Sequence, residues 1–274
     1  MNFDIELVGK IGSMALVNRE YNDINYNVIS RISRELLPGY VWVTSGAVEI
    51  GRLDYLQRNG RELSGGEGDN KTDYAAQGQS ILMQTYRQYI DSRFSVRQIL
   101  VEHYHFNDAE KSSHLRETIL RCPSQNAIPI INYNDAVSSE ENVKMELSAL
   151  KSKLANVHEC LDNDETAAQL ACLLKARRLL ILTSVDGIYE NIDDPATLVA
   201  EISGSDTAEL LANIDRYASG CRGASRRGAN GARAKLEYIK APAQNGTEVI
   251  IANAKYRIKD ILSGAAPRTV VKVR

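Results

Sequence analysis

Four apolar runs along the chain each end in small polar residues. They are YVWVTSGAVEIG at 40–51, IPIINYND at 128–135, LLILTSVDG at 179–187 and VIIAN at 249–253. Short apolar, β-branched runs bounded by turn residues are typical of buried strands. Ligands bind beyond the carboxyl ends of strands in open α/β sheets, so the pattern predicts a site there. Any single run could equally end in an ordinary turn, because Ser, Asn, Asp and Gly favour turns.

Segments with helical spacing alternate with these runs. Residues 25–37, 74–90 and 109–121 are predicted helices, and 3–8 and 96–101 are further predicted strands. Alternating β and α elements favour a mostly parallel sheet with helices on both faces. We therefore predict an α/β fold, a three-layer αβα sandwich, which 274 residues could form as one large domain or as two lobes that share a sheet.

Three polar segments interrupt this alternation. The glycine-rich segment 62–73 has no apolar periodicity and is predicted to be a mobile loop. Residues 138–161 form a charged amphipathic helix that we interpret as a surface insertion. The segment SGCRGASRRGANGARAK at 219–235 is basic, rich in glycine and precedes a predicted helix at 234–241. Such a loop suits phosphate, although a solvated loop would have the same composition.

Composition excludes several classes of function. The net charge is -2 and the pI is about 6.1, so no overall basic field favours nucleic acid. The four cysteines form no CxxC pair, which predicts free thiols and disfavours zinc. No apolar run approaches the roughly 18 residues of a membrane span. We expect a soluble, cytoplasmic protein that binds neither nucleic acid nor membrane.

Two short motifs carry candidate chemistry by themselves. Lys10 lies between Gly9 and Gly12 at the end of a predicted strand, where its ammonium and nearby backbone N–H groups could bind phosphate. A solvated turn would look the same. Asp162, Asn163 and Asp164 precede an apolar run at 167–174. They either begin a helix, whose dipole favours acidic residues, or face a charged substrate.

Taken in order, the motifs resemble the amino acid kinase family and, within it, the kinase domains of glutamate 5-kinases. The resemblance rests on GKIGS at 9–13, VTSGAVEIG at 43–51, AAQGQ at 75–79, IPIINYNDAV at 128–137, DND at 162–164, LLILTSVDGIY at 179–189 and GANGARAKLE at 228–237. It covers nearly the whole chain, which implies that residues 1–274 form a single kinase domain with 268–274 as its last strand.

The resemblance implies ATP-dependent phosphorylation of the side-chain carboxylate of glutamate, or of a similar amino acid, to an acyl phosphate, as in proline biosynthesis. Residues 1–170 would bind the acceptor and 171–274 the nucleotide. Lys10 and Lys235 would flank the transferred phosphoryl group and Asp164 would orient them. Mg²⁺ would bridge ATP oxygens, with no protein side chain assigned to it. The family also suggests a homo-oligomer, either a dimer or a tetramer.

The resemblance further assigns two sets of binding residues. The acceptor set is Ser45, Gly46, Ala47, Asn132, Asp135, Asp162 and Asn163. The nucleotide set is Lys10, Gly12, Ser13, Thr183, Ser184, Asp186, Gly228, Gly231 and Lys235.

Departures from the family pattern leave two alternatives open. GANGA at 228–232 stands where the family has GTGGM, and Ser184 stands where it has aspartate. A degenerate, kinase-like binding protein would explain these changes. The long insertion at 138–161 leaves room for a different acceptor, such as the phosphate of UMP or isopentenyl phosphate. Such an acceptor would need a basic residue near Ser45, where Arg52 is the obvious one.

Overall fold

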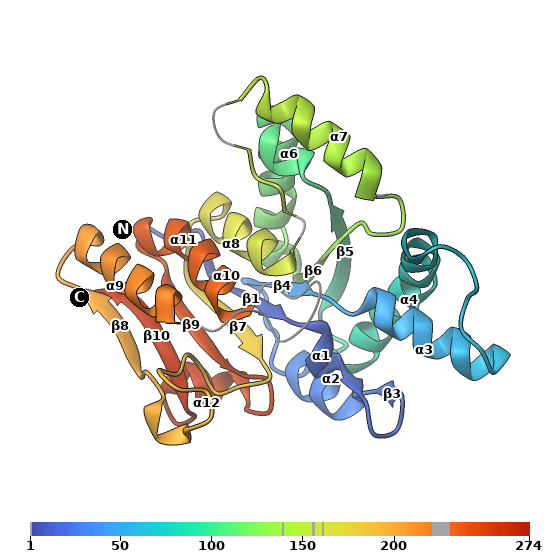
Figure 1. Ribbon diagram of the computed structural model, residues 1–274, viewed down its shortest axis with the longest axis horizontal. Helices are drawn as coiled ribbons and strands as arrows, with labels where there is room; N and C mark the ends of the chain where they lie inside the picture. Colours follow the sequence, from blue (N-terminus) through green and yellow to red (C-terminus); the bar gives the residue numbers. More distant parts are fainter. Residues whose placement is uncertain (1, 139, 155–156, 161, 221–230) are drawn as a thin grey trace. The chain divides into compact units, whose positions relative to one another are not determined.

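The computed structural model describes residues 2–138, 140–154, 157–160, 162–220 and 231–274 (Figure 1). The chain divides into two compact units. The first unit comprises Met1–Ile11, Gly39–Trp42 and Asp164–Arg274, and the second comprises Gly12–Pro38 and Val43–Asn163.

The first unit contains a mostly parallel set of strands. In order across the sheet they are β1 (Ile5–Ile11), β7 (Ala176–Thr183), β9 (Glu248–Asn253), β10 (Arg268–Val273) and β8 (Glu201–Gly204). β7 pairs in parallel with β1 and β9, and β8 pairs in parallel with β10, whereas β10 runs antiparallel to β9. The centre of β7, from Leu179 to Leu182, is almost fully buried. Burial on both faces is the reason these strands read as continuous apolar runs.

Helices cover the strands of the first unit. They are α8 (Asn163–Leu173, whose first residue belongs to the second unit), α9 (Thr207–Gly220), α10 (Gly231–Tyr238), α11 (Lys240–Gln244) and α12 (Ile258–Ser263), with the 3₁₀ turn η2 (Pro195–Thr197). α9 buries Leu210 and Ile214 and packs against β8, α10 and α11 (orange to red in Figure 1). This packing fixes α10, which carries Lys235.

The second unit is built around β5 (Ser95–Val101) and β6 (Ala127–Tyr133), which pair in parallel. β4 (Tyr40–Thr44) contributes its last two residues to this unit. Its helices are α1 (Ser13–Leu16), α2 (Tyr26–Ser33), α3 (Ala47–Asn59), α4 (Glu67–Tyr89), α5 (Tyr104–Asn107), α6 (Ala109–Leu120) and α7 (Glu140–Lys151), with the 3₁₀ turn η1 (Pro123–Gln125) and the small hairpin β2 (Val17–Asn18) and β3 (Asp23–Ile24). Every residue of β6 is buried.

α3 and α4 approach each other at backbone distance. A Cβ at Gly51 would lie 1.9 Å from the carbonyl oxygen of Tyr74, and a Cβ at Gly78 would lie 1.9 Å from that of Ala47. Only glycine fits such a contact, because any side chain would overlap the facing backbone. The two glycines therefore hold the start of α3 against the middle of α4. Gln79, the residue after Gly78, is held in place by the same contact.

The predicted fold class, a mostly parallel sheet with flanking helices, is confirmed, but several element boundaries were wrong. β1 continues to Ile11, so Lys10 lies inside a strand and not in a turn after it. α2 ends at Ser33, four residues earlier than predicted, because the chain turns before it reaches Pro38. α10 begins at Gly231, three residues earlier than predicted, while 221–230 lie outside the described residues.

The segment predicted as a mobile loop at 62–73 is helical from Glu67 onward. Two effects explain the helix. Glu67 and Asp69 occupy its first turn, where the helix dipole favours acidic side chains. Asn70 Nδ2 also donates to the carbonyl oxygens of Leu63 and Gly65, which anchors the preceding residues to the helix.

The insertion at 138–161 contains the predicted amphipathic helix, now α7, which buries Val143 and Leu147. Asn107 of α5 binds the segment that follows α7. The Asn107 side chain accepts a hydrogen bond from the N–H of His158 at 2.9 Å and donates one to the carbonyl oxygen of His158 at 2.7 Å. Within the described ranges, no helix combines the length and apolar character needed to cross a membrane. The described cysteines, Cys122, Cys160 and Cys172, are free thiols.

Candidate active site

β1 carries a lysine into the interior of the first unit. Lys10 is only 6% exposed. Its neighbour Gly9 makes room for Trp42, since a Cβ at Gly9 would lie 2.1 Å from the Trp42 ring. The Nζ atom of Lys10 lies 2.6 Å from Oδ1 of Asp164, the second residue of α8. A buried cation needs a paired anion, and here the pairing is direct.

A second lysine contacts the other oxygen of the same carboxylate. Lys235 Nζ, from α10, lies 2.6 Å from Asp164 Oδ2. The Lys235 side chain is 24% exposed, whereas that of Asp164 is 2% exposed. Three separate elements, β1, α8 and α10, thus bring two ammonium groups to one buried carboxylate. The three residues predicted to be catalytic lie together.

The charges explain the ionisation of this cluster. Burial by itself would raise the pKa of Asp164, but the charges of Lys10 and Lys235 and their hydrogen bonds outweigh it, so the pKa lies below its ordinary value. Two ammonium groups against one carboxylate leave a net charge of about +1. Each ammonium has three N–H donors. One donor of each is directed at Asp164, and the others suit an anion such as a phosphoryl group.

In the second unit, Ser45, Asn132 and Asn163 form a hydrogen-bonded cluster. Asn163 Nδ2 donates to Ser45 Oγ and to Asn132 Oδ1, each at 3.1 Å. Asn132 Nδ2 donates to Gln79 Oε1 at 2.8 Å. Three predicted acceptor-site residues are therefore joined, together with Gln79, which was not predicted. The amides come from β6, α8 and α4, and Ser45 follows β4.

Gly46 and Ala47 lie at the beginning of α3. Gly46 precedes the helix with a φ of 101°, a left-handed conformation that favours glycine, and Ala47 is the first helical residue. The first turn of a helix leaves backbone N–H groups without partners inside the helix. Together with Ser45, this turn offers hydrogen-bond donors to an anionic group, and the helix dipole adds to the attraction.

Asp135 faces a lysine. Its Oδ1 lies 3.6 Å from Nζ of Lys71 on α4. Burial raises the pKa of Asp135, and the charge of Lys71 offsets this only in part. The remaining predicted acceptor residue, Asp162, is half-buried next to the first residue of α8.

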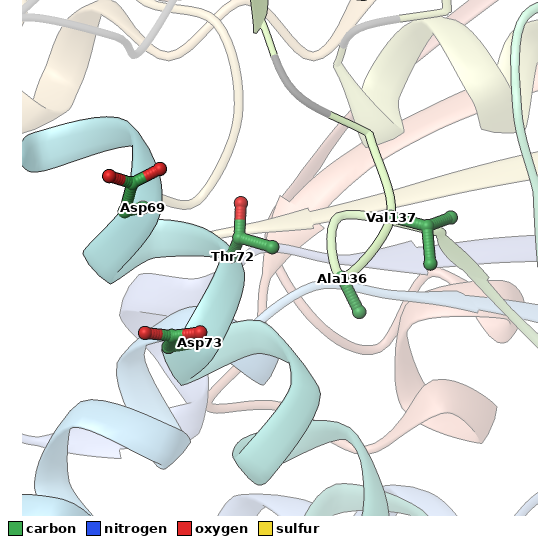
Figure 2. A pocket seen from close by; sticks show the side chains of 5 residues that line it. All are labelled: Asp69, Thr72, Asp73, Ala136 and Val137. Carbon is green, nitrogen blue, oxygen red and sulfur yellow. The ribbon is translucent and has the colours of Figure 1, made fainter.

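A hollow of about 420 Å³ is lined by residues of α4 and by the two residues that follow Asp135 in the chain. Figure 2 shows Asp69, Thr72 and Asp73 of α4 lying opposite Ala136 and Val137, which directly follow Asp135 in the chain. The lining carries two carboxylates and a hydroxyl, so its character is acidic. Such a lining favours a cationic group over a second anion.

The residues predicted to bind nucleotide are distributed along several elements. Gly12 and Ser13 begin α1, in the second unit. Gly231, with a φ of 60°, begins α10, and Gly228 lies outside the described residues.

Thr183, Ser184 and Asp186 lie at and after the end of β7. Thr183 Oγ1 accepts from the N–H of Val185 at 3.0 Å, and the carbonyl of Ser184 accepts from Asn253 Nδ2 at 3.0 Å. Asp186 Oδ1 lies 2.9 Å from Lys255 Nζ. Among the residues that the structure describes, no group of three or more His, Cys, Asp or Glu side chains could hold a metal ion.

Gln79 and Lys71 are the two residues of these clusters that sequence reasoning missed. Gln79 ends the motif AAQGQ, and its glycine neighbour was a signal of close packing. Lys71 lies in the segment that was predicted to be a loop. Neither residue has a local pattern that points to Asn132 or Asp135, which are more than fifty residues away in the chain.

Comparison with known proteins gives concordant results. The sequence profile described as "Amino acid kinase family" matches residues 7–253. The chain is 30% identical over 262 residues to a glutamate 5-kinase of Streptococcus suis, which covers 91% of this chain and 64% of that protein. It is also 28% identical over 271 residues to a glutamate 5-kinase of Clostridium perfringens. That match covers 94% of this chain and 91% of the Clostridium protein. The chain thus spans less than two thirds of the first relative and nearly all of the second.

Among solved structures, the UMP kinase of Bacillus anthracis superposes with a TM-score of 0.56 and 12% sequence identity. The superposition covers 97% of this chain and 95% of the UMP kinase. At this identity the likeness concerns the fold alone.

Proposed function

This chain belongs to the amino acid kinase family, and we propose that it transfers the γ-phosphoryl group of ATP to the side-chain carboxylate of an amino acid. Glutamate is the first candidate, because relatives at 26–30% identity over most of the chain are named glutamate 5-kinase. The observation that carries the proposal is the pair of lysines, Lys10 and Lys235, bound to the two oxygens of Asp164.

In the proposed reaction, a carboxylate oxygen of the acceptor attacks the γ-phosphorus of ATP. The bond between that phosphorus and the oxygen bridging to the β-phosphate breaks, and ADP leaves with the electron pair. The product is an acyl phosphate. The attacking carboxylate is already ionised at neutral pH, so no general base is needed.

Lys10 and Lys235 would donate hydrogen bonds to the oxygens of the transferred group. In a loose transition state the negative charge of the transferred group is spread over those oxygens, and fixed positive charge directed at them in a buried site lowers the barrier. Asp164 would hold both ammonium groups in place without neutralising them fully. Mg²⁺, when bound, would neutralise charge on ATP; such ions are usually bound by substrate phosphates, water and one or two carboxylates.

The acceptor would bind in the second unit. Ser45 and the first turn of α3 offer donors to a carboxylate, and Asp135 offers an acceptor to an α-ammonium group. Asn163, in the acceptor cluster, and Asp164, in the lysine cluster, are consecutive residues.

The amino acid kinase family suggests three further points. We propose that residues 1–170 serve mainly the acceptor and 171–274 mainly the nucleotide. We also propose that the reaction supports proline synthesis in the cytoplasm and that the chain acts as a homo-oligomer.

A phosphate acceptor is less well supported. Arg52, the basic residue near the Ser45 turn, is held by two carboxylates, at 3.2 Å from Glu49 and 2.6 Å from Glu62. The acidic hollow lined by α4 residues would repel a phosphate further. The fold likeness to a UMP kinase therefore does not outweigh the chemistry of the residues.

ADP release with Mg²⁺-ATP tests the proposal. The acceptors compared would be glutamate, aspartate, other amino acids and UMP. We expect release with glutamate or another amino acid that has a side-chain carboxylate. Release with UMP alone would replace the proposed acceptor by a phosphate, and the absence of release with every acceptor would favour the degenerate, kinase-like binding protein.

A further inference from the structure

One backbone N–H group determines how a buried amide cluster of the second unit is oriented. The N–H of Tyr133 donates to Asn132 Oδ1 at 2.9 Å. A backbone nitrogen can only donate, so the atom that it meets must be the oxygen of the Asn132 amide. The nitrogen of that amide then faces the opposite way, toward Gln79, which must present its oxygen, at 2.8 Å.

The same reasoning continues to the acceptor-site serine. Asn132 Oδ1 also contacts the amide of Asn163, which must therefore present its nitrogen, at 3.1 Å. That nitrogen donates at the same time to Ser45 Oγ, at 3.1 Å. Because the Ser45 oxygen accepts this bond, its own hydrogen is directed to another acceptor. The cluster thereby sets the half-exposed Ser45 hydroxyl as a donor.

Gln79 is present at a cost to stability. It is 9% exposed, and its Nε2 is buried without a hydrogen-bond partner among the residues that the structure describes. A buried donor without a partner is unfavourable, and an apolar residue of similar volume would avoid it. The oxygen of Gln79 is the part that has a partner, namely Asn132 Nδ2. Its location is fixed, since the preceding Gly78 contacts the backbone of Ala47.

We propose that Gln79 is a positioning residue that acts through Asn132 and Asn163 to direct the Ser45 hydroxyl toward a carboxylate oxygen of the acceptor. Gln79 does not touch the acceptor itself. This inference rests on the proposed function, because it assumes a carboxylate acceptor at Ser45.

A double-mutant cycle in the full chain tests the inference, with the acceptor KM as its readout. Gln79→Met removes the oxygen that faces Asn132, and Ser45→Ala removes the hydroxyl. Each variant alone is expected to raise the KM for glutamate about tenfold, as expected for one hydrogen bond to a charged group. The KM for ATP should stay unchanged. In the Ser45→Ala background, Gln79→Met is expected to have no further effect, because both act on the same bond.

Two further variants separate positioning from general packing. Gln88→Met makes the same substitution at an exposed position of α4, and it should leave both KM values unchanged. Gln79→Glu keeps an oxygen toward Asn132 in either protonation state, so its KM for glutamate should stay within about threefold of wild type. If Gln79→Met fails to fold, Gln79→Glu still tests whether the oxygen at position 79 is the part that matters.

Each outcome decides the question. Additive effects of Gln79→Met and Ser45→Ala, an unchanged KM in Gln79→Met, or a Gln79→Glu variant as impaired as Gln79→Met would overturn the inference while the proposed function stands. A wild-type protein without turnover on any amino acid would instead overturn the proposed function, and this inference with it.

Discussion

Lys10 and Lys235 share a single counter-ion, each with its Nζ atom 2.6 Å from a different oxygen of Asp164. Their environments differ, since the Lys10 side chain is 7% exposed and that of Lys235 is 24% exposed. Lys10 is part of a strand that is fixed by its pairing with β7, whereas Lys235 extends from a helix. The two lysines should therefore respond differently to substitution.

Asp164→Asn should abolish most activity and destabilise the protein. Breaking a buried ion pair by removing one partner leaves an uncompensated charge, here on Lys10, and costs about 3–5 kcal/mol. We expect a fall in kcat of about 10²–10³-fold, similar to the loss of one electrostatic contact in other enzymes. Urea unfolding and ADP release measure the two effects. Asp193→Asn, which changes an exposed carboxylate of the same unit, serves as the control, and equal losses in both variants would contradict the role assigned to Asp164.

The difference in stability between wild type and Asp164→Asn should depend on pH with a definite sign. Because the pKa of Asp164 is lowered on folding, its ionisation stabilises the protein above the ordinary value of 3.8. This contribution is lost as the pH falls through the lowered pKa. The stability difference between wild type and Asp164→Asn should therefore be constant at neutral pH and shrink only below about pH 4. A difference that shrinks between pH 6 and 8 would point to another group.

Lys235→Ala should remove activity with little loss of stability. The side chain is 24% exposed and Asp164 keeps its contact with Lys10, so stability should change little, while the transferred phosphoryl group loses one of its two cations. We expect kcat to fall about a hundredfold or more. Lys240→Ala is a matched control, because its side chain is also 24% exposed and also pairs with carboxylates. Unchanged turnover in Lys235→Ala, with a folded protein by circular dichroism, would refute its catalytic role.

Asp135→Asn should make the protein more stable and a poorer binder of the acceptor. Burial raises the pKa of Asp135, so this group stabilises the fold below its ordinary pKa of 3.8, and that contribution is lost as the pH rises through the raised value. At pH 7.5 the ionised carboxylate is therefore unfavourable, and asparagine removes that cost. We expect a higher Tm at pH 7.5, with the gain diminishing toward pH 4.

The same variant should bind the acceptor more weakly. Loss of a charged partner of the α-ammonium group should raise the acceptor KM by about thirtyfold or more. Asp193→Asn, at an exposed position of the first unit, should change neither Tm nor KM. A lower Tm together with an unchanged KM in Asp135→Asn would contradict both parts of the prediction.

Gly78→Ala should disrupt the α3–α4 contact. The added Cβ would lie 1.9 Å from the carbonyl oxygen of Ala47 and 2.5 Å from the nitrogen of Gly51, so backbone must move. We expect a loss of about 3 kcal/mol, at the upper end of overpacking effects. Gly68→Ala on the same helix meets no atom within 4 Å and should be neutral or stabilising, by up to about 1 kcal/mol. Equal denaturant midpoints for the two variants would show that the helices can separate freely.

The sequence predicted the strands well because buried parallel strands are continuous apolar runs. The runs at 128–135 and 179–187 became β6 and β7 with shifts of a few residues. Lys10 shows the limit of this approach. Glycine and lysine are depleted in strands, so the pattern placed a turn where β1 continues. Trp42 fills the space above Gly9, and Asp164 pairs with Lys10, but both partners are distant in sequence.

The candidate site was only partly predictable for a similar reason. Motif resemblance named Ser45, Asn132 and Asn163, which hydrogen bonds join in the structure. Gln79 lies on a predicted helix, where a polar residue is usually exposed to solvent. Its burial and its bond to Asn132 depend on tertiary packing through Gly78. For Gly228, a predicted nucleotide-binding residue outside the described range, the assignment stays a prediction.

The most direct test of carboxylate phosphorylation is chemical trapping of the product. Wild-type protein would be incubated with Mg²⁺-ATP, glutamate and hydroxylamine, and hydroxamate would be quantified together with ADP, with Lys235→Ala measured in parallel. The account predicts one hydroxamate for each ADP with wild type and neither product with the variant. Release of ADP from glutamate-containing mixtures without hydroxamate, or equal hydroxamate from both proteins, would contradict it.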